Sequence, residues 1–340
     1  MNILFITVNS PPLFSGRAKQ AHELSIALTQ VDYKIDIISL DQSNNCINGN
    51  CLHRLKYEDK LKSLIKILSL SLHYDVVHIH GLNYSLLLAP LLKLINKKVV
   101  LHMSSLGYDD PITMNKSNLL RFLLKFVDFH IVQKKSLEID NKTRFIPNLL
   151  SIKTKKSSRT CVNSYIDILV SGVICQRKRQ VEILYWLKKL SNNYVRVHFA
   201  GSFVNNYNEF EKDYVNEFNC LASELENCRV YGQLEKNELQ ALMTKSHYFF
   251  AISKQEGLSN SYIECLSSNL IPISFMNNVD ELFDVMGIGN NILLIDDMDC
   301  LNYDFMKTKI LNEEYDFSEK ALEFFSKDSV INHLNRIYKA

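Results

Sequence analysis

Two carboxylates eight residues apart give this chain its clearest chemical signal. They bound the segment Glu256-Gly-Leu-Ser-Asn-Ser-Tyr-Ile-Glu264, which follows an apolar run at 248–252. The apolar run predicts a buried strand, and a helix is predicted to begin near Ser261. Free backbone N–H groups and the positive end of the helix dipole would then lie beside both side chains. Such a site could hold a diphosphate on its N–H groups and sugar hydroxyls on its carboxylates.

Each of these carboxylates also has a purely structural interpretation. Ser261 and Glu264 have the spacing of a capping box, in which the Glu264 side chain accepts a hydrogen bond from the backbone N–H of Ser261. Taken alone, this is the simpler interpretation of Glu264. Glu256 could be a solvated loop carboxylate. The residue pattern alone therefore leaves both a ligand-binding role and a structural role open for each carboxylate.

Three consecutive cations follow another predicted strand. The strand at 166–171 leads into Gly172-Val-Ile-Cys-Gln and then into Arg177, Lys178 and Arg179, which open a helix. Ligands of open parallel sheets bind at the carboxyl ends of the strands, and arginine and lysine both hold phosphate. The alternative is a solvated basic turn, but the position at the end of a strand favours anion binding.

The first loop, Asn9-Ser-Pro-Pro-Leu-Phe-Ser-Gly16-Arg17, places a glycine beside the start of a helix. Backbone N–H groups at such a helix start can accept a phosphate. The loop has neither the Gly-x-Gly-x-x-Gly pattern nor the P-loop pattern, so the sequence disfavours nicotinamide-dependent dehydrogenases and P-loop NTPases. An ordinary connection between a strand and a helix is the alternative.

Short apolar runs that alternate with helical patterns must position these loops. Strands are predicted at 3–8, 35–40, 76–80, 99–103, 129–132, 166–171, 195–200, 248–252, 271–275 and 292–295. Helices are predicted at 18–29, 57–72, 84–95, 118–127, 179–191, 208–226, 235–245, 262–268 and 318–338. Apolar strands separated by helices are typical of parallel sheets that are buried on both faces. We therefore expect two doubly wound α/β domains that face a cleft and are divided near the polar segment 151–163.

The composition of the 340-residue chain excludes several other classes of protein. Apolar residues make up 46% and charged residues 22%, which suits two packed cores and not a disordered or fibrous chain. No secretory signal and no membrane-spanning apolar stretch is visible, and the eight cysteines form no Cys-x-x-Cys pair. We therefore expect a cytoplasmic protein with reduced thiols.

The formal charge of +2 is unevenly distributed along the chain. Residues 1–150 carry 18 lysines and arginines against 12 acidic residues, a balance of +6, whereas residues 151–340 have a balance of −4. Basic amphipathic stretches at 60–68 and 121–126 lie in the basic half. They predict either two ordinary surface helices or a surface that docks on an anionic membrane.

The ordered set of motifs resembles the retaining glycosyltransferases of family 4, which have the GT-B fold. The segment from Glu256 to Glu264 is similar to the family's Glu-x7-Glu signature. The other landmarks, which span nearly the whole chain, are the strand at 2–7 with Gly16, Asp75-Val-Val-His-Ile-His80, Ile146-Pro-Asn148, Gly172 with Lys178, Ala200-Gly201 and Tyr231-Gly232. The end of the chain is similar to the family's last helix, which crosses back to the N-terminal domain.

The resemblance implies an acceptor-side domain at 1–155, a nucleotide-sugar-binding domain at 156–322 and a returning helix at 323–340. It implies that a sugar is transferred from a UDP- or GDP-sugar with retention of configuration at the anomeric carbon. The acceptor would be a glycan, or a glycan linked to a lipid diphosphate, in the synthesis of a surface polysaccharide such as a capsule or O-antigen. No metal and no cofactor are expected. The protein would act in the cytoplasm, either free or in peripheral contact with the inner face of the cell membrane.

The resemblance also implies roles for individual residues. Glu256 would contact hydroxyls of the donor sugar near the reacting carbon, and Glu264 would bind the ribose. Lys178 would neutralise the diphosphate, where negative charge develops as the sugar leaves. The remaining donor-binding positions are Gly16, Arg177, Gly257, Leu258 and Ser259.

The chain departs from the family pattern at several positions. Val173 stands where the family usually has an arginine, so Arg177 or Arg179 would have to supply that charge. Glycines usual in the family are replaced by Leu149 and Ser15. A histidine near the end of the fourth strand often faces the donor sugar, and both His102 and Ser104, on one face of that strand, are candidates for this place.

Two other groups of residues have chemical potential. Asp109 and Asp110 follow the fourth strand and precede Pro111, which predicts either a turn or a contact with acceptor hydroxyls. His78 and His80 alternate on one strand and could bind a metal ion. The sequence places no third ligand beside them, so we expect packed or hydrogen-bonded histidines.

Rival functions remain open at this point. A nucleotide-sugar epimerase on the same fold would need no acceptor, and a non-catalytic nucleotide-sugar-binding module would fit the departures at Val173 and Leu149. A nucleic-acid binder is disfavoured, because the basic residues are not interleaved with aromatic residues.

Overall fold

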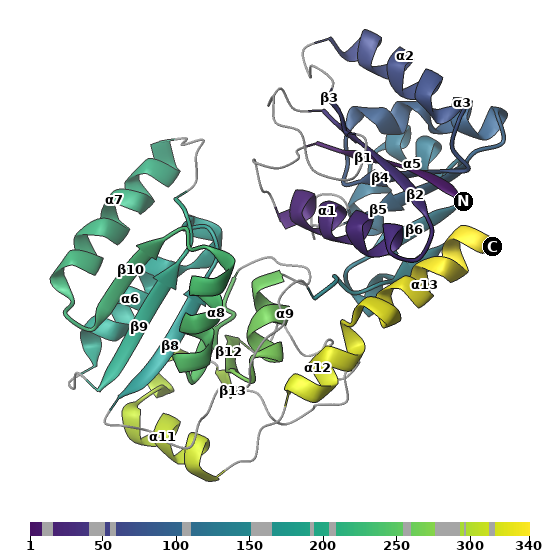
Figure 1. Ribbon diagram of the computed structural model, residues 1–340. Helices are drawn as coiled ribbons and strands as arrows, with labels where there is room; N and C mark the ends of the chain where they lie inside the picture. Colours follow the sequence, from purple (N-terminus) through teal and green to yellow (C-terminus); the bar gives the residue numbers. More distant parts are fainter. Residues whose placement is uncertain are drawn as a thin grey trace. The chain divides into compact units, whose positions relative to one another are not determined.

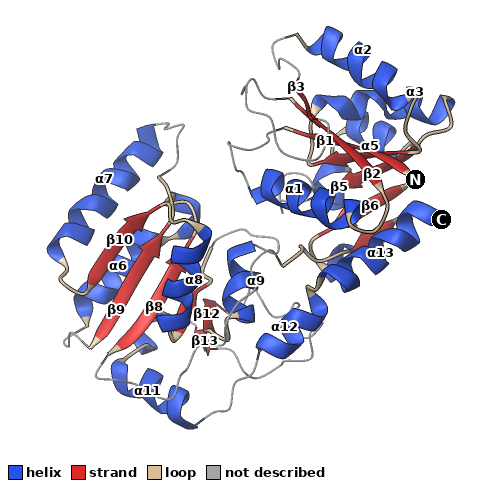
Figure 2. Cartoon of the chain, viewed as in Figure 1, coloured by secondary structure: helices blue, strands red, loops and turns tan. Residues whose placement is uncertain are grey.

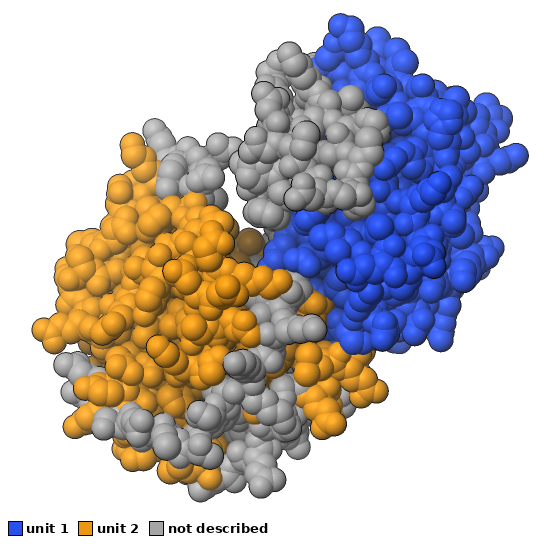
Figure 3. All heavy atoms as spheres, in the orientation of Figure 1, with its two compact units in different colours: residues 1–149, 257–260, 325–340 blue, residues 150–256, 261–324 orange. Residues whose placement is uncertain are grey.

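Two parallel β-sheets organise the part of the chain that this computed structural model describes, namely residues 1–8, 16–40, 52–54, 59–103, 110–150, 165–190, 194–203, 209–253, 260–275, 293–295, 297–312 and 317–340. Unit 1 comprises residues 1–149, 257–260 and 325–340, and unit 2 comprises 150–256 and 261–324 (Figure 3). Each unit has one of the two sheets, with helices packed on it (Figures 1 and 2). The division falls at Leu149–Leu150, where the sequence analysis expects it near 151–163, a segment outside the described residues.

The sheet of unit 1 has seven strands within the described residues, in the order β3-β2-β1-β4-β5-β6-β7, and every neighbouring pair is parallel. The strands are β1 (Asn2–Thr7), β2 (Lys34–Ser39), β3 (Leu52–Arg54), β4 (Val76–His80), β5 (Lys98–His102), β6 (Phe129–Val132) and β7 (Thr143–Phe145). Every residue of β4 is buried, as expected for a central parallel strand.

The helices of unit 1 cover both faces of this sheet. They are α1 (Gly16–Thr29), α2 (Lys60–Ser71), η1 (Tyr84–Leu88), α3 (Ala89–Leu94), α4 (Pro111–Met114), α5 (Asn118–Leu124), η2 (Lys135–Leu137) and α13 (Lys327–Lys339). Two separate apolar cores result. One lies under α2, α3 and α5, and the other lies under α1 and α13.

Helix α13 reaches unit 1 from the far end of the chain and completes the second core. Its buried residues include Val330, Leu334 and Tyr338, which pack in one cluster with Phe5 of β1. The ammonium of Lys98 donates to the carbonyl of Tyr338 at 2.9 Å, which satisfies a carbonyl of the last helical turn. The last helix therefore belongs structurally to the N-terminal half.

The sheet of unit 2 has six strands within the described residues, in the order β10-β9-β8-β11-β12-β13, again all parallel. They are β8 (Ile166–Ser171), β9 (Val195–Ala200), β10 (Cys228–Gly232), β11 (Tyr248–Phe250), β12 (Ile271–Phe275) and β13 (Leu293–Ile295). Its helices are η3 (Gln176–Lys178), α6 (Gln180–Lys189), α7 (Glu209–Glu224), α8 (Lys236–Lys245), α9 (Asn260–Ser267), η4 (Met298–Cys300), α11 (Tyr303–Asn312) and α12 (Ser318–Phe324).

The structure confirms the expected pair of doubly wound α/β domains and corrects several element assignments. Three short strands, β3, β7 and β10, are absent from the sequence prediction, as are helices α4 and α11. The single helix predicted at 84–95 is a 3-10 helix followed by α3. The helix predicted at 318–338 is divided into α12 and α13, because the side chain of Ser326 caps the start of α13 and accepts from the N–H of Ser329.

A buried carboxylate connects three strands of unit 2. Asp167 of β8 accepts two hydrogen bonds from the Arg196 guanidinium, at 2.7 and 2.8 Å, and lies 2.8 Å from Nε2 of His198. The hydroxyl of Tyr231 on β10 is 3.0 Å from Nδ1 of His198. Burial alone would raise the pKa of Asp167, but the hydrogen bonds from His198 and Arg196 and the guanidinium charge outweigh it and lower the pKa to about 2.

We expect this network to make unit 2 sensitive to acid. An unfolded aspartate has a pKa of about 4, so the ionised Asp167 stabilises the fold above that pH, and the contribution is lost as the pH falls through about 2. Asp167→Asn should lower the free energy of unfolding at pH 7 by about 1.5–3 kcal/mol. Urea denaturation at several pH values would show the difference from the wild type shrinking below pH 4. Asp213→Asn, at an exposed position of α7, is the control, and a pH-independent difference would contradict the prediction.

Candidate functional site

The order of strands in unit 2 identifies one place for a ligand. From β8 the chain adds β9 and β10 on one side, and from β11 it adds β12 and β13 on the other. The loops after β8 and β11 therefore leave neighbouring strands in opposite directions. In open parallel sheets, ligands bind at this switch point, outside the carboxyl ends of the strands.

Three adjacent strands end at glycines, and we call this end of the sheet the glycine edge. Gly172, after β8, has a φ of +132°, a conformation that L side chains rarely adopt. A Cβ at Gly201, after β9, would lie 1.9 Å from the carbonyl oxygen of Gly172. Gly232 ends β10 with a φ of +68°, and its carbonyl accepts from the N–H of Gly201 at 2.8 Å. Gly201 is therefore required for the close packing of the backbone at the ends of β8 and β9, whereas a Cβ at Gly232 would meet nothing within 4 Å.

Lys178 lies at this glycine edge. A Cβ built on Gly172 would lie 3.5 Å from both Cε and Nζ of Lys178, so the ammonium group lies beside the end of β8. The side chain is only partly buried. This places a positive charge at the switch point, and the diphosphate contact expected of Lys178 stays a prediction.

A buried glutamine holds the loop that carries Lys178. Gln180, at the start of α6, is 1% exposed. Its Nε2 donates to the carbonyl of Val173 at 3.0 Å, and its Oε1 accepts from the N–H of Cys175 at 3.3 Å. Gln180 was not predicted from the sequence, because a glutamine that follows three cations belongs to no distinctive motif. Its contacts with Val173 and Cys175 depend on the path of the loop.

The two arginines beside Lys178 differ in environment. Arg177 is exposed. Arg179 has a left-handed backbone, with φ 61°, and its guanidinium lies 4.5 Å from the centre of the Phe275 ring and contacts Glu182 at 3.3 Å. These interactions engage the Arg179 side chain away from the end of β8.

The second predicted carboxylate, Glu264, lies on α9, the helix that follows β11. Its side chain is buried, with 3% exposure. Helix α9 begins at Asn260, so Ser261 lies inside the helix and not at the N-cap that the capping-box interpretation requires. Glu256, Gly257, Leu258 and Ser259 lie outside the described residues.

The predicted residues of unit 1 are partly described. Gly16 is the first residue of α1, which follows β1. Asp110 is buried and caps α4, where its side chain accepts from the N–H of Thr113 at 2.9 Å. Asp110 therefore begins a short helix at the place where the residues before Pro111 predict a turn. Ser104 and Asp109 lie outside the described residues, so the contacts predicted for them, with the donor sugar and with the acceptor, stay predictions.

His102 has two histidine neighbours that the sequence analysis did not connect with it. In the parallel register of β4 and β5, His80 lies opposite His102, and His78 shares their face of the sheet. The ring centres of His102 and His80 are 5.2 Å apart, and those of His78 and His80 are 4.3 Å apart. The sequence analysis found no third partner for His78 and His80, and the structure supplies one.

Burial keeps these three histidines uncharged. It lowers the pKa of His102 to about 4 and holds the pKa values of His78 and His80 well below the usual range. Nδ1 of His78 is 2.7 Å from the hydroxyl of Tyr338, and Nε2 of His102 is 2.9 Å from Nε2 of Gln133. Gln133 is a second residue that the sequence analysis missed.

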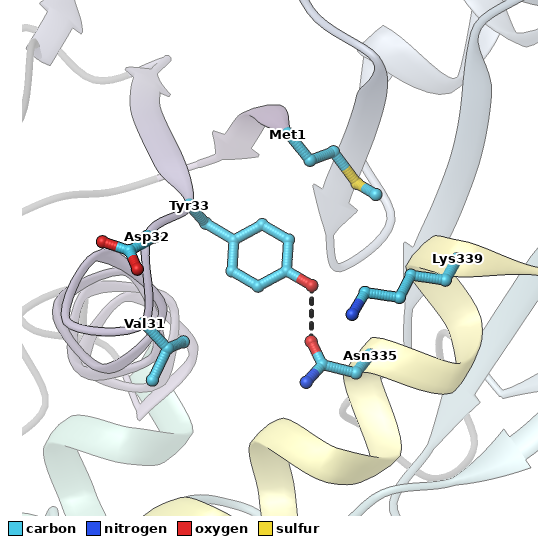
Figure 4. A pocket seen from close by; sticks show the side chains of 6 residues that line it. All are labelled: Met1, Val31, Asp32, Tyr33, Asn335 and Lys339. Carbon is cyan, nitrogen blue, oxygen red and sulfur yellow. Dashed lines mark hydrogen bonds between the residues drawn. The ribbon is translucent and has the colours of Figure 1, made fainter.

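One further pocket lies in unit 1, between α13 and the turn after α1 (Figure 4). The hydroxyl of Tyr33 donates to Oδ1 of Asn335 across it. Its lining residues are Met1, Val31, Asp32, Tyr33, Asn335 and Lys339. None of them is a predicted site residue, so the pocket adds nothing to the candidate site.

Comparison with known proteins identifies the fold. No protein-family profile and no curated protein sequence matches the chain. Among solved structures, HepE from Anabaena, in complex with UDP and glucose, has a TM-score of 0.76 at 12% identity, with 100% of this chain and 99% of that chain covered. Sucrose-phosphate synthase from Thermosynechococcus elongatus has a TM-score of 0.76 at 15% identity, with 99% and 98% covered. A glycosyltransferase from Rickettsia africae has a TM-score of 0.68 at 15% identity, with 99% and 97% covered. At such identities the likeness establishes the architecture, which is the GT-B fold.

The glycine edge gives a prediction about Gly201. In Gly201→Ala, the new Cβ would clash with the backbone of Gly172 and displace the loop that carries Lys178. We expect a loss of about 1–3 kcal/mol in the free energy of unfolding, measured by urea denaturation. Gly232→Ala is the control, since a Cβ there meets nothing within 4 Å and adds only backbone strain. If Gly232→Ala lowered the free energy of unfolding more than Gly201→Ala, the close packing of Gly201 on Gly172 would not be what limits stability here.

Proposed function

We propose that this protein is a retaining glycosyltransferase of the family 4 type that transfers a sugar from a UDP- or GDP-sugar to a glycan or lipid-diphosphate-linked glycan of a surface polysaccharide. The observation that carries the proposal is the switch point of unit 2. The loop after β8 brings Lys178 there, beside Gly172, and the glycines let the ends of β8 and β9 pack closely. The loop after β11 leads into α9 with Glu264.

The chemistry of glycosyl transfer requires this combination of groups. As the bond between sugar and diphosphate breaks, negative charge develops on the leaving diphosphate and positive charge on the sugar ring. Lys178, supported by Arg177, would stabilise the leaving group, and N–H groups at 257–259 would add to this. Glu256 would contact the sugar and Glu264 the ribose. These charges are fixed before the reaction, so little reorganisation is needed.

The residues of unit 1 complete the proposal. Gly16 starts α1 without a side chain, and this would allow a close approach of the first loop to the donor. His102 and Ser104 are the candidates for a contact with the donor sugar, and Asp109 and Asp110 for contacts with the acceptor. The reaction would need no metal ion. The same-fold structure of HepE, solved with UDP and glucose, supports a nucleotide-sugar donor.

Substitutions at Lys178 and Glu256 should separate donor binding from turnover. Lys178→Ala should weaken UDP or GDP binding about 10–100-fold, because a charged contact to the diphosphate is lost. Glu256→Gln should lower kcat far more than nucleotide affinity, because its contact matters most in the transition state. Calorimetry of nucleotide binding and a product assay with donor and acceptor would measure both. Lys212→Ala, on the exposed side of α7, is the control.

Three outcomes would contradict parts of the proposal. Unchanged nucleotide affinity in the Lys178 variant would remove this residue from the site. A new nucleotide sugar formed from the donor in the absence of acceptor would favour the epimerase. Tight nucleotide binding without turnover of any donor would favour a binding module.

A basic and apolar surface of unit 1 supports contact with a membrane. Helices α2, α3 and α5 lie on the same core and form neighbouring parts of one face. Large apolar side chains protrude from them, with exposures of 71% at Leu61, 62% at Ile65 and 79% at Leu94. The basic residues of these helices are Lys60, Lys62, Lys66, Lys93 and Arg121. None of the helices in the described part of the chain is long and apolar enough to cross a bilayer.

This combination suits an anionic bilayer surface, because exposed apolar side chains enter the interface while lysine and arginine attract acidic lipids. A lipid-linked acceptor would be presented at such a surface. We therefore propose that unit 1 docks peripherally on the inner face of the cell membrane through α2, α3 and α5.

Vesicle binding tests the docking surface. The protein should sediment with vesicles that contain phosphatidylglycerol and not with pure phosphatidylcholine vesicles. Leu61→Ser together with Ile65→Ser should weaken binding at least about tenfold, since each buried leucine or isoleucine contributes about 1.5–3 kcal/mol. Leu311→Ser in unit 2, where Leu311 is also 62% exposed, should leave it unchanged. If the double variant and Leu311→Ser lost vesicle binding equally, the docking surface would not be the one formed by α2, α3 and α5.

A further inference from the structure

Three histidines converge in the core of unit 1. His78 and His80 come from β4 and His102 comes from β5, and their exposures are 0%, 4% and 8%. Each offers one ring nitrogen to a group of three atoms that all lie within 4.8 Å of one another. It is the only group of three or more histidine, cysteine or acidic residues of this kind in the described ranges.

Each of these rings has one buried nitrogen without a hydrogen-bond partner in the described structure. The atoms are Nε2 of His78, Nε2 of His80 and Nδ1 of His102. A buried polar atom without a partner costs about 1–3 kcal/mol, and three of them in one cluster are unusual in a native core. A single ion between them would satisfy all three at once.

The position of the cluster also suits a ligand. In unit 1 the chain adds β2 and β3 on one side of β1, and β5, β6 and β7 on the far side of β4, so the switch point lies between β1 and β4. His80 and His102 are the last residues of their strands. Phe5 of β1 lies 4.9 Å from His78 and 4.7 Å from His80, measured between ring centres, and closes the cluster on one side.

We propose that His78, His80 and His102 bind one Zn²⁺ ion through Nε2, Nε2 and Nδ1. Zinc is coordinated readily by neutral imidazole at about 2.0–2.1 Å, and three histidine ligands leave a fourth position for a water molecule. No carboxylate or thiolate takes part, so the site favours zinc and related ions such as Co²⁺ over Mg²⁺ or Ca²⁺.

Metal binding requires small adjustments of the rings. Tetrahedral zinc holds its nitrogen ligands about 3.4 Å apart, so the three atoms must move closer by rotation of the side chains. Ligation through Nδ1 of His102 puts the ring proton on Nε2, so the Gln133 amide must turn its oxygen toward that atom. The hydroxyl of Tyr338 already lies where it can accept the proton on Nδ1 of His78.

The bound ion would connect β4 to β5 directly and, through Tyr338, would fix the end of α13. It would therefore stabilise unit 1. The transfer reaction itself does not require the ion. Because zinc and Gln133 would occupy both ring nitrogens of His102, the donor-sugar contact of the proposed function would then be left to Ser104.

The test is metal binding by the intact chain, purified without a histidine tag and stripped with a chelator. One equivalent of Co²⁺ should give the visible absorption of a four-coordinate site, and Zn²⁺ should displace it. Zinc at about 100 times its Kd should raise the Tm by about 5 °C or more, because the ion binds only the folded state.

Two variants and a matched control locate the site. His80→Gln should abolish the Co²⁺ spectrum and the rise in Tm. His130→Gln should leave both intact, since His130 is also a buried histidine of unit 1 but lies outside the cluster. Gln133→Glu should tighten zinc binding about 10–100-fold, because a carboxylate on Nε2 of His102 makes the ligand more basic. The Tm of each metal-free variant reports whether it folds.

A spectrum and a Tm shift that are lost in His80→Gln, kept in His130→Gln and strengthened in Gln133→Glu support the proposal. Failure of the wild type to bind one equivalent of Co²⁺ or Zn²⁺ would overturn it, and an ordered water molecule would then be the partner of the three nitrogens. Binding that survives in a folded His80→Gln variant, or that Gln133→Glu leaves unchanged, would also overturn it.

Discussion

The requirement that a parallel sheet be buried on both faces governs this structure. In unit 1 the helices α2, α3 and α5 cover one face, and α1 covers only part of the other. Helix α13 covers the rest with five buried residues, Val330, Ile331, Leu334, Ile337 and Tyr338. Each such burial contributes about 1.5–3 kcal/mol, so the N-terminal unit depends on residues more than 300 positions from its first strand.

The same parallel arrangement creates the sites. Every strand of a unit ends at the same edge of its sheet, and the change in the direction of strand addition opens a space between two loops. In unit 2 this edge has Gly172, Gly201 and Lys178. In unit 1 it has His80 and His102. The charged edge suits a diphosphate, and the neutral, nitrogen-rich edge suits a metal ion.

Much of the fold was predictable because central parallel strands are continuous apolar runs. Five of the ten predicted strands have the observed bounds, and the others differ by no more than two residues at either end. The three missed strands are short edge strands. Most of β10 is exposed, so its sequence lacks the apolar run that identifies a strand. The breaks within the predicted helices were missed because a capping residue such as Ser326 leaves no mark in the pattern of apolar residues.

The sequence by itself determined the two-domain α/β architecture and the order of the motifs, because apolar periodicity is a local property of the chain. It also determined that Lys178 follows a strand end. Only the tertiary structure decided which strands are neighbours. The pairing of β4 with β5 sets His80 opposite His102, and the position of the Lys178 side chain beside Gly172 depends on the path of the loop. Such contacts join residues that are distant in sequence, and no local pattern encodes their register.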